Sequence, residues 1–164
     1  MAIAFVDGRV VVGNGQVLER ASVLVEDDRI LKVAPKHFTP PKGCRRIPLE
    51  GGTLLPGFID AHVHVCLDAG PDPMASFLKT PLVVTVLKAA AFARDTLIAG
   101  VTSIRDMGAR DGIDFGLRQA IRSGLAPGPR MLVSGTPICM TGGHGWQIGF
   151  EADGPDAVRR AARA

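Results

Sequence analysis

Two histidines separated by a single residue, His62 and His64, are the side chains of this sequence best placed to do chemistry. They belong to residues 58–66, an apolar and β-branched run that predicts a buried β-strand. Side chains two positions apart on a strand point to the same side, so Asp60 would share their face. Three polar groups on one buried face would each cost about 1–3 kcal/mol without partners. Neutral imidazole is a good zinc ligand, so the pattern predicts His62 and His64 as ligands of a divalent metal.

Other residues could support or surround such a site. A carboxylate can orient a ligating imidazole, which makes Asp60 a candidate supporting group, although its place deeper along the strand also suits packing. Asp106 follows a second apolar run and suits a helix cap, a loop hydrogen-bond acceptor or a supporting role in the site. The glycines around His144 would let the backbone approach a ligand, so we predict that His144 contacts substrate. Cys66 continues the histidine face, and a small apolar filler is favoured there over a metal ligand.

The remaining patterns argue against other classes of site. The pair Gly142-Gly143 is not followed by the Gly-Lys-Ser/Thr segment of a phosphate-binding loop, so a small phosphate or nucleotide binder has only glycine richness in its favour. One tryptophan, no tyrosine and a net charge of +3 that is spread along the chain give little support to a nucleic-acid surface. His37 lies in a proline-rich loop, where we expect a surface position. Phosphate and nucleic-acid sites are therefore disfavoured, whereas a His-x-His pair on a strand is by itself more often structural than metal-binding.

The elements that must position these residues alternate between strand and helix. Apolar runs predict strands and periodic segments predict helices, and glycines at 100 and 124 are suited to end the first two helices. A β-α-β-α-β order predicts an α/β fold with parallel strands and right-handed connections, whose long loops meet at one edge. Asp153 is expected to cap the last helix, and Thr85, Lys88 and Asp95 to form the polar stripe of the first. The predicted strands are 58–66, 101–105 and 131–134, the helices are 82–99, 112–123 and 155–164, and the long loops are 66–80, 106–111 and 135–152.

Residues 1–56 have a different pattern and are expected to form a separate β-domain. Residues 3–34 predict a β-meander with turns at Gly13-Asn14-Gly15 and Asp27-Asp28. The proline-rich segment 35–43 predicts a loop, followed by short strands at 45–49 and 53–55. The chain is thus expected to divide into a β-domain at 1–56 and an α/β part at 57–164.

Composition places the chain among folded proteins of the cell interior. It has 164 residues, of which 46% are hydrophobic and 21% charged, a balance that excludes a disordered protein. Three cysteines without a Cys-x-x-Cys motif indicate reduced thiols. The start of the chain lacks a basic signal-peptide region, and the apolar run 81–99 contains three charged residues. We therefore expect a cytoplasmic protein without membrane or nucleic-acid partners.

Several segments together resemble the amidohydrolase superfamily. The apolar-Pro-Gly-apolar-Ile-Asp segment at 54–60 and the following His-Val-His form the signature of its first barrel strand. Residues 100–108 resemble its second strand, and residues 128–135 with Thr-Gly-Gly-His-Gly at 141–145 resemble its third strand and loop. The last motif is typical of the branch that contains imidazolonepropionase-like enzymes and metal-dependent Xaa-Pro dipeptidases.

This resemblance implies a TIM-type (β/α)8 barrel with a small β-sandwich-like domain, and a hydrolase. A metal-activated water would cleave the C–N bond of a cyclic amide or dipeptide-like small molecule. The family holds one or two divalent ions, typically zinc, with the histidine pair, a carboxylated lysine, two further histidines and an aspartate that moves the proton. By this resemblance, His62 and His64 bind metal and His144 contacts substrate.

The sequence carries only the first part of that pattern. A closed barrel of this kind takes about 250 residues, and only three barrel strands are expected here. The later metal ligands and the family's general-base aspartate have no counterpart, so no catalytic residue is assigned in this chain. We expect an N-terminal fragment that forms homo-oligomers or associates with the missing C-terminal part. The alternative is a non-catalytic scaffold or assembly subunit that keeps the amidohydrolase fold.

Overall fold

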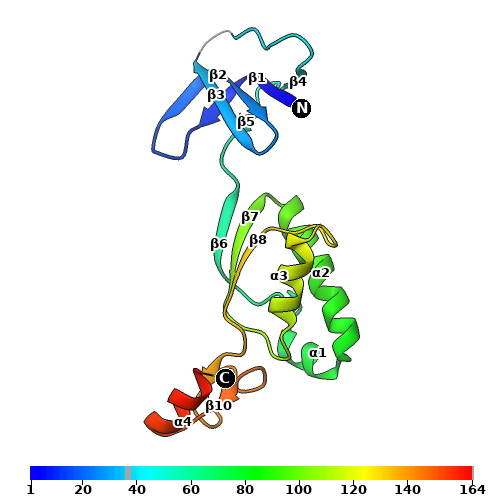
Figure 1. The fold of residues 1–164 in the computed structure, drawn as a ribbon, viewed down its shortest axis with the longest axis vertical. Coiled ribbons are helices and arrows are strands. Elements are labelled where there is room, and N and C mark those ends of the chain that lie inside the picture. Colours follow the sequence, from blue (N-terminus) through cyan, green and yellow to red (C-terminus); the bar gives the residue numbers. More distant parts are fainter. Residues whose placement is uncertain (36–37, 164) are drawn as a thin grey trace. The chain divides into compact units, whose positions relative to one another are not determined.

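The computed structural model describes residues 1–35 and 38–163, and these form two compact units (Figure 1). The first unit is Met1–Pro56 and the second is Gly57–Ala164. The units differ in class, because the first is built from strands and the second alternates strands with helices. His37, expected at the surface, lies outside the described residues.

The first unit is one five-stranded sheet. Its strands follow the order β3-β2-β1-β4, and β5 also pairs with β1. The first three strands are antiparallel neighbours, which confirms the meander, whereas β4 and β5 run parallel to β1. Buried side chains of β1 and β2 form two clusters, one with Ala4, Val6 and Leu24 and the other with Val10, Ala21 and Val23. Buried residues alternate along β1 but are consecutive at 21–24 in β2. The strands are β1 (Ala2–Val11), β2 (Val17–Glu26), β3 (Arg29–Pro35), β4 (Arg45–Pro48) and β5 (Thr53–Leu54).

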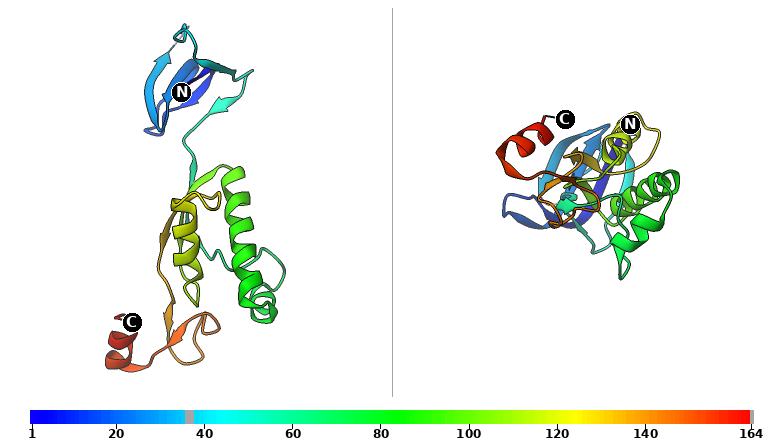
Figure 2. Two further views of the ribbon diagram at one scale, coloured as in Figure 1. Left: turned by 45° about the vertical axis from the view of Figure 1, so that its right-hand side comes forward. Right: turned by 90° about the horizontal axis from the view of Figure 1, so that it is seen from below.

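The second unit contains a parallel sheet in the order β6-β7-β8. The helices α2 and α3 lie on the same side of this sheet (Figure 2). Each helix returns the chain to the start of the next strand, so the long connections gather at the carboxyl ends of the strands. The elements are β6 (Phe58–Val63), α2 (Leu82–Ile98), β7 (Val101–Asp106), α3 (Ile113–Arg122) and β8 (Arg130–Val133).

The connection after β6 contains a helix, α1 (Pro73–Lys79), so the prediction of a loop throughout 66–80 was wrong. The Asp72 carboxylate accepts a hydrogen bond from the Ala75 N–H at 3.0 Å, and Pro73 takes a first-turn position where its missing N–H costs nothing. Phe77 is buried and anchors the helix to the core. Seven residues are too few to show a helical period, but the Asp-Pro pair was a usable start signal.

Helix α2 approaches the sheet with its small residues. Ala89 and Ala93 are fully buried, and Thr85 is buried beside them with its hydroxyl donating to the Pro81 carbonyl at 3.2 Å. The sequence had predicted Thr85 in a polar, solvent-exposed stripe, but the side chain is buried. Small side chains allow a helix backbone to lie close to a sheet, which leaves Leu87 and other large residues exposed. No helix among the described residues is long and apolar enough to cross a membrane.

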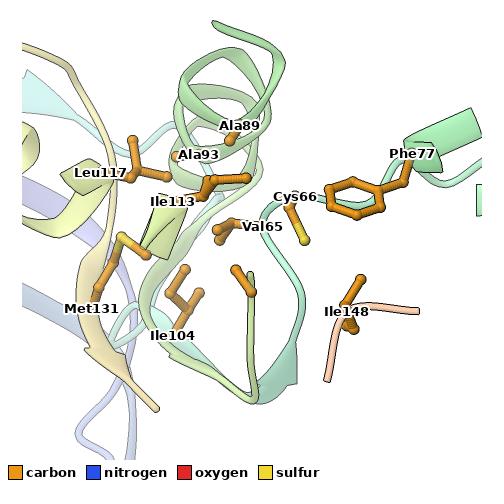
Figure 3. Close-up of a cluster of buried hydrophobic side chains, with 11 residues drawn as sticks. Val65, Cys66, Phe77, Ala89, Ala93, Ile104, Ile113, Leu117, Met131 and Ile148 are labelled. Atoms are coloured by element: carbon orange, nitrogen blue, oxygen red, sulfur yellow. The ribbon is translucent and has the colours of Figure 1, made fainter. Parts of the chain in front are cut away.

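The core of the second unit joins the sheet, the helices and the loops at the carboxyl ends of the strands. Figure 3 shows Val65, Ile104 and Ile113 gathered in this cluster, with Cys66 near Phe77. Ile148 belongs to the same cluster and so ties the segment after β8 to the core. That segment contains β9 (Ile138–Cys139) and β10 (Phe150–Glu151), which pair with each other, and it leads to α4 (Gly154–Ala161).

Candidate metal and substrate site

The two histidines of the His-Val-His motif lie at the carboxyl end of β6. His62 is inside the strand and His64 directly follows its last residue. Their ring centres are 5.6 Å apart, with an angle of 67° between the ring planes. Two imidazoles bound to one tetrahedral zinc at about 2.0–2.1 Å place their ring centres roughly 5 Å apart. The separation is therefore compatible with a single ion held by both side chains.

His64 is oriented by a backbone carbonyl of the neighbouring strand's loop. Its Nδ1 lies 2.8 Å from the carbonyl oxygen of Gly108. A carbonyl oxygen can only accept, so Nδ1 carries a proton, and in the neutral ring this leaves the lone pair on Nε2. This is the arrangement that metal-binding histidines commonly use. Gly108 has φ of 136°, and a Cβ there would lie 2.6 Å from Pro137, so only glycine fits this close approach.

Asp106 acts as a hydrogen-bond acceptor for two backbone groups near His64, one in the residue that follows it and one in the residue that bonds its ring. Its carboxylate is fully buried and accepts hydrogen bonds from the N–H groups of Val65 and Gly108, each at 2.8 Å. Burial is the main cause that raises the pKa of Asp106, and the two N–H donors oppose the shift. Asp106 therefore fixes the residue after His64 and the residue whose carbonyl orients its ring.

Asp60 does not share a simple alternating face with the two histidines. Asp60 pairs with Ile104 and Val63 pairs with Asp106, so two residues of β6 stand opposite one of β7 between these pairs. This bulge interrupts the strict alternation on which the sequence prediction depended. The exposed Asp60 carboxylate accepts a hydrogen bond from the His62 N–H at 3.1 Å. This hydrogen bond stabilises the backbone at His62.

His144 lines the same pocket as His62 and His64, and this pocket has a volume of about 700 Å³. The pocket lies at the carboxyl ends of the strands, where the connections after β6, β7 and β8 meet. A turn after β9 directly precedes His144, and in this turn the Gly143 N–H donates to the Met140 carbonyl at 2.8 Å. The structure thus brings together the three histidines that the sequence had singled out for metal and substrate.

Two carboxylates hold the glycine-rich loop that carries His144. Glu151 accepts from the Gly142 N–H at 2.6 Å, and Asp153 accepts from the Thr141 N–H at 3.1 Å and from the Thr141 hydroxyl. These bonds to Thr141 lower the pKa of Asp153. Asp153 does precede α4, but its side chain makes no capping bond, because its oxygens are used by the loop.

Sequence reasoning missed a second buried carboxylate besides Asp106, that of Asp114 on α3. It is fully buried and accepts from the Gly135 N–H at 2.8 Å, at the start of the 135–152 segment, and from the Phe115 N–H at 2.9 Å. An acid in the first turn of a helix usually needs no such partner, so its position gave no signal of this role.

Cys66 packs as an apolar residue. It is 4% exposed and belongs to the core cluster, and burial is the main cause that raises the pKa of its thiol to about 12. A thiol in this state is a poor metal ligand because ligation requires the thiolate. Within the described ranges, no group of three or more His, Cys, Asp or Glu residues is arranged to hold a metal.

We expect Cys66 to react with a disulfide reagent at least about a hundredfold more slowly than Cys44 and Cys139 in the folded protein at pH 8. The thiolate is the reactive form, and both burial and the raised pKa reduce its availability. Thiol titration before and after denaturation measures the effect, and a Cys66→Ala variant identifies the slow phase. Three thiols reacting at one rate in the folded protein would contradict this burial.

The fold and the site define an α/β protein with a histidine-lined pocket at the carboxyl ends of its parallel strands, the usual place for function in such folds. The model of the amidohydrolase family matches residues 53–164. The chain belongs to the amidohydrolase family.

Known proteins similar to this chain include enzymes and solved structures. The imidazolonepropionase of Micrococcus luteus is 30% identical over 113 residues, which cover 69% of this chain and 25% of that enzyme. The ochratoxinase of Aspergillus niger is 29% identical over 191 residues, covering 95% of this chain and 38% of that enzyme. A prolidase structure complexed with N-methylphosphonate-L-proline has a TM-score of 0.82 at 30% identity and covers 99% of this chain and 43% of its own. The chain therefore spans less than half of each of these relatives.

Proposed function

We propose that this chain forms the first part of a metal-dependent amidohydrolase that cleaves the C–N bond of a cyclic amide or a dipeptide-like substrate. One observation carries the proposal: the His64 ring, with its Nδ1 bonded to Gly108, lies beside His62 in a pocket that His144 also lines. Family membership and the likeness to imidazolonepropionase and prolidase support the same class of reaction.

In this proposal, His62 and His64 would hold a divalent ion, with zinc as the favoured metal. The bound metal would supply an activated water and polarise the scissile carbonyl. The Gly108 carbonyl keeps the proton of His64 on Nδ1, and Asp106 keeps that carbonyl in place through the Gly108 N–H. His144 would contact the substrate from the opposite loop. Stable zinc sites usually take three or four protein ligands, so the other ligands and the general base would come from polypeptide outside these 164 residues.

We further propose that the three parallel strands are the first three of a (β/α)8 barrel. In the described chain, β6 and β8 each pair on one side only, and large apolar residues of β6 and α2 are exposed. Parallel sheets are normally covered on both faces and continue at their edges. A second copy of the chain or the remaining barrel would cover these surfaces.

The proposal is tested on the longest reading frame that contains these residues, purified with zinc and assayed on cyclic amides and Xaa-Pro dipeptides. We expect hydrolysis that a chelator abolishes and that added zinc restores. Substitution of His62 by alanine should lower kcat/KM by about a hundredfold or more, because the metal activates the attacking water. Folded protein that binds zinc but hydrolyses none of these substrates would instead favour the scaffold subunit.

A further inference from the structure

We propose that the part of the pocket wall formed by this chain takes an uncharged, apolar group of the substrate, such as an aromatic or branched aliphatic side chain next to the scissile amide. This inference rests on the proposed function and adds the class of substrate. It comes from the residues that surround the three histidines.

Apolar side chains from four parts of the second unit form this wall. They come from the connection after β6, from α1, from the end of β7 and from the segment after β8. Apart from the histidines, the described residues of the lining contribute two polar side-chain groups, the amide of Gln147 and the indole N–H of Trp146. The apolar lining residues are Leu67, Met74, Met107, Pro137, Ile138, Trp146 and Ile148.

Charged side chains do not contribute to this wall. The described residues that line the pocket include no Asp, Glu, Lys or Arg. The nearby carboxylates are engaged elsewhere, because Asp106 accepts from Val65 and Gly108, while Glu151 accepts from Gly142. A charged substrate group packed against these apolar side chains would therefore lose hydration without meeting a charged side chain, whereas an apolar group would be removed from water at no such cost.

Trp146 and the two methionines explain how such a wall could hold a ring or a branched chain. Trp146 is 50% exposed, so much of its side chain remains available for contact. Met74 and Met107 are flexible, polarizable side chains that adapt to the shape of an apolar group and make favourable contacts with aromatic rings. The wall therefore selects for apolar character more than for one shape.

The sole tryptophan of the chain gives a direct measurement, because Trp146 lies in the pocket. The 164-residue chain is titrated without metal with four amides: N-acetyl-phenylalaninamide, N-acetyl-leucinamide, N-acetyl-aspartamide with a free side-chain carboxylate, and N-acetyl-lysinamide. We expect the two apolar amides to change Trp146 fluorescence saturably, with at least tenfold lower Kd than the two charged ones. Equal Kd values for all four, tighter binding of a charged amide, or no response to any of them would overturn the inference.

A charge placed in the wall provides the matched variant. Met74→Lys should weaken binding of the phenylalanine amide at least tenfold and improve binding of the acidic amide. Leu125→Lys introduces the same charge at a residue that is 83% exposed and outside the pocket lining, and it should leave all four Kd values unchanged. Thermal unfolding of both variants checks that each is folded, and equal effects of the two variants would count against the inference.

This experiment is separate from the test of the proposed function, because fluorescence is read without metal and without turnover. Apolar preference together with a failure to hydrolyse any amide would remove only the proposed function. Hydrolysis with a preference for charged substrates would remove only the present inference.

Discussion

Replacing Asp106 by alanine is expected to lower the free energy of unfolding of the Gly57–Ala164 unit by about 3 kcal/mol. The fully buried carboxylate accepts hydrogen bonds from the N–H groups of Val65 and Gly108, and alanine would leave both donors buried without partners. The raised pKa of Asp106 records the cost of burying the charge, so the net loss is smaller than that of two ideal charged bonds. Denaturant unfolding followed by circular dichroism measures the change.

Two further variants make the Asp106 prediction specific. Asp106→Asn keeps one side-chain acceptor for two donors, so we expect about half of the alanine effect. Asp156→Ala removes a carboxylate that is 92% exposed and forms an ion pair with Arg159 on the surface of α4, and its effect should stay within about 0.5 kcal/mol. If Asp106→Ala were as mild as Asp156→Ala, the carboxylate would not be what holds the loops on either side of His64.

Replacing His64 by alanine is expected to lower zinc occupancy of the chain about tenfold or more at a fixed free zinc concentration. In the proposed site His62 and His64 are the two ligands from the described residues, so each removal would take away half of them. Equilibrium dialysis followed by elemental analysis gives the bound metal directly. His62→Ala should have the same effect, because both rings would share the ion.

His144→Ala is the matched control for the metal experiment, since it removes the same type of side chain from the same pocket. We expect it to change zinc occupancy less than twofold, because His144 is assigned to substrate. Asp106→Asn should weaken zinc binding about tenfold through the orientation of His64. Less than one-tenth equivalent of zinc in the unaltered chain, unchanged by His62→Ala, would remove the metal assignment.

Much of the local structure could be predicted because its signals are local. The hairpin at Asp27-Asp28 follows from turn residues between alternating strands, and the helices α2 and α3 follow from periodicity and the glycines after them. Helix α1 was missed, although Asp72-Pro73 is a start signal, because seven residues show no period. The polarity of Thr85 misled the prediction, since a threonine hydroxyl can bond within its own helix and so be buried at little cost.

The candidate site, like the secondary structure, could be predicted from the sequence only in part. The placement of His62 and His64 near the end of a strand and the glycine-rich setting of His144 could be predicted, because both are patterns of neighbouring residues. The groups that hold these histidines became visible only in the folded chain. The acceptors Asp106 and Asp114 bond backbone groups 41 and 21 residues away, and the Gly108 carbonyl that sets the proton of His64 lies 44 residues from it. A carboxylate's local sequence does not show which distant N–H groups the fold will bury beside it, so these roles depend on the packed chain.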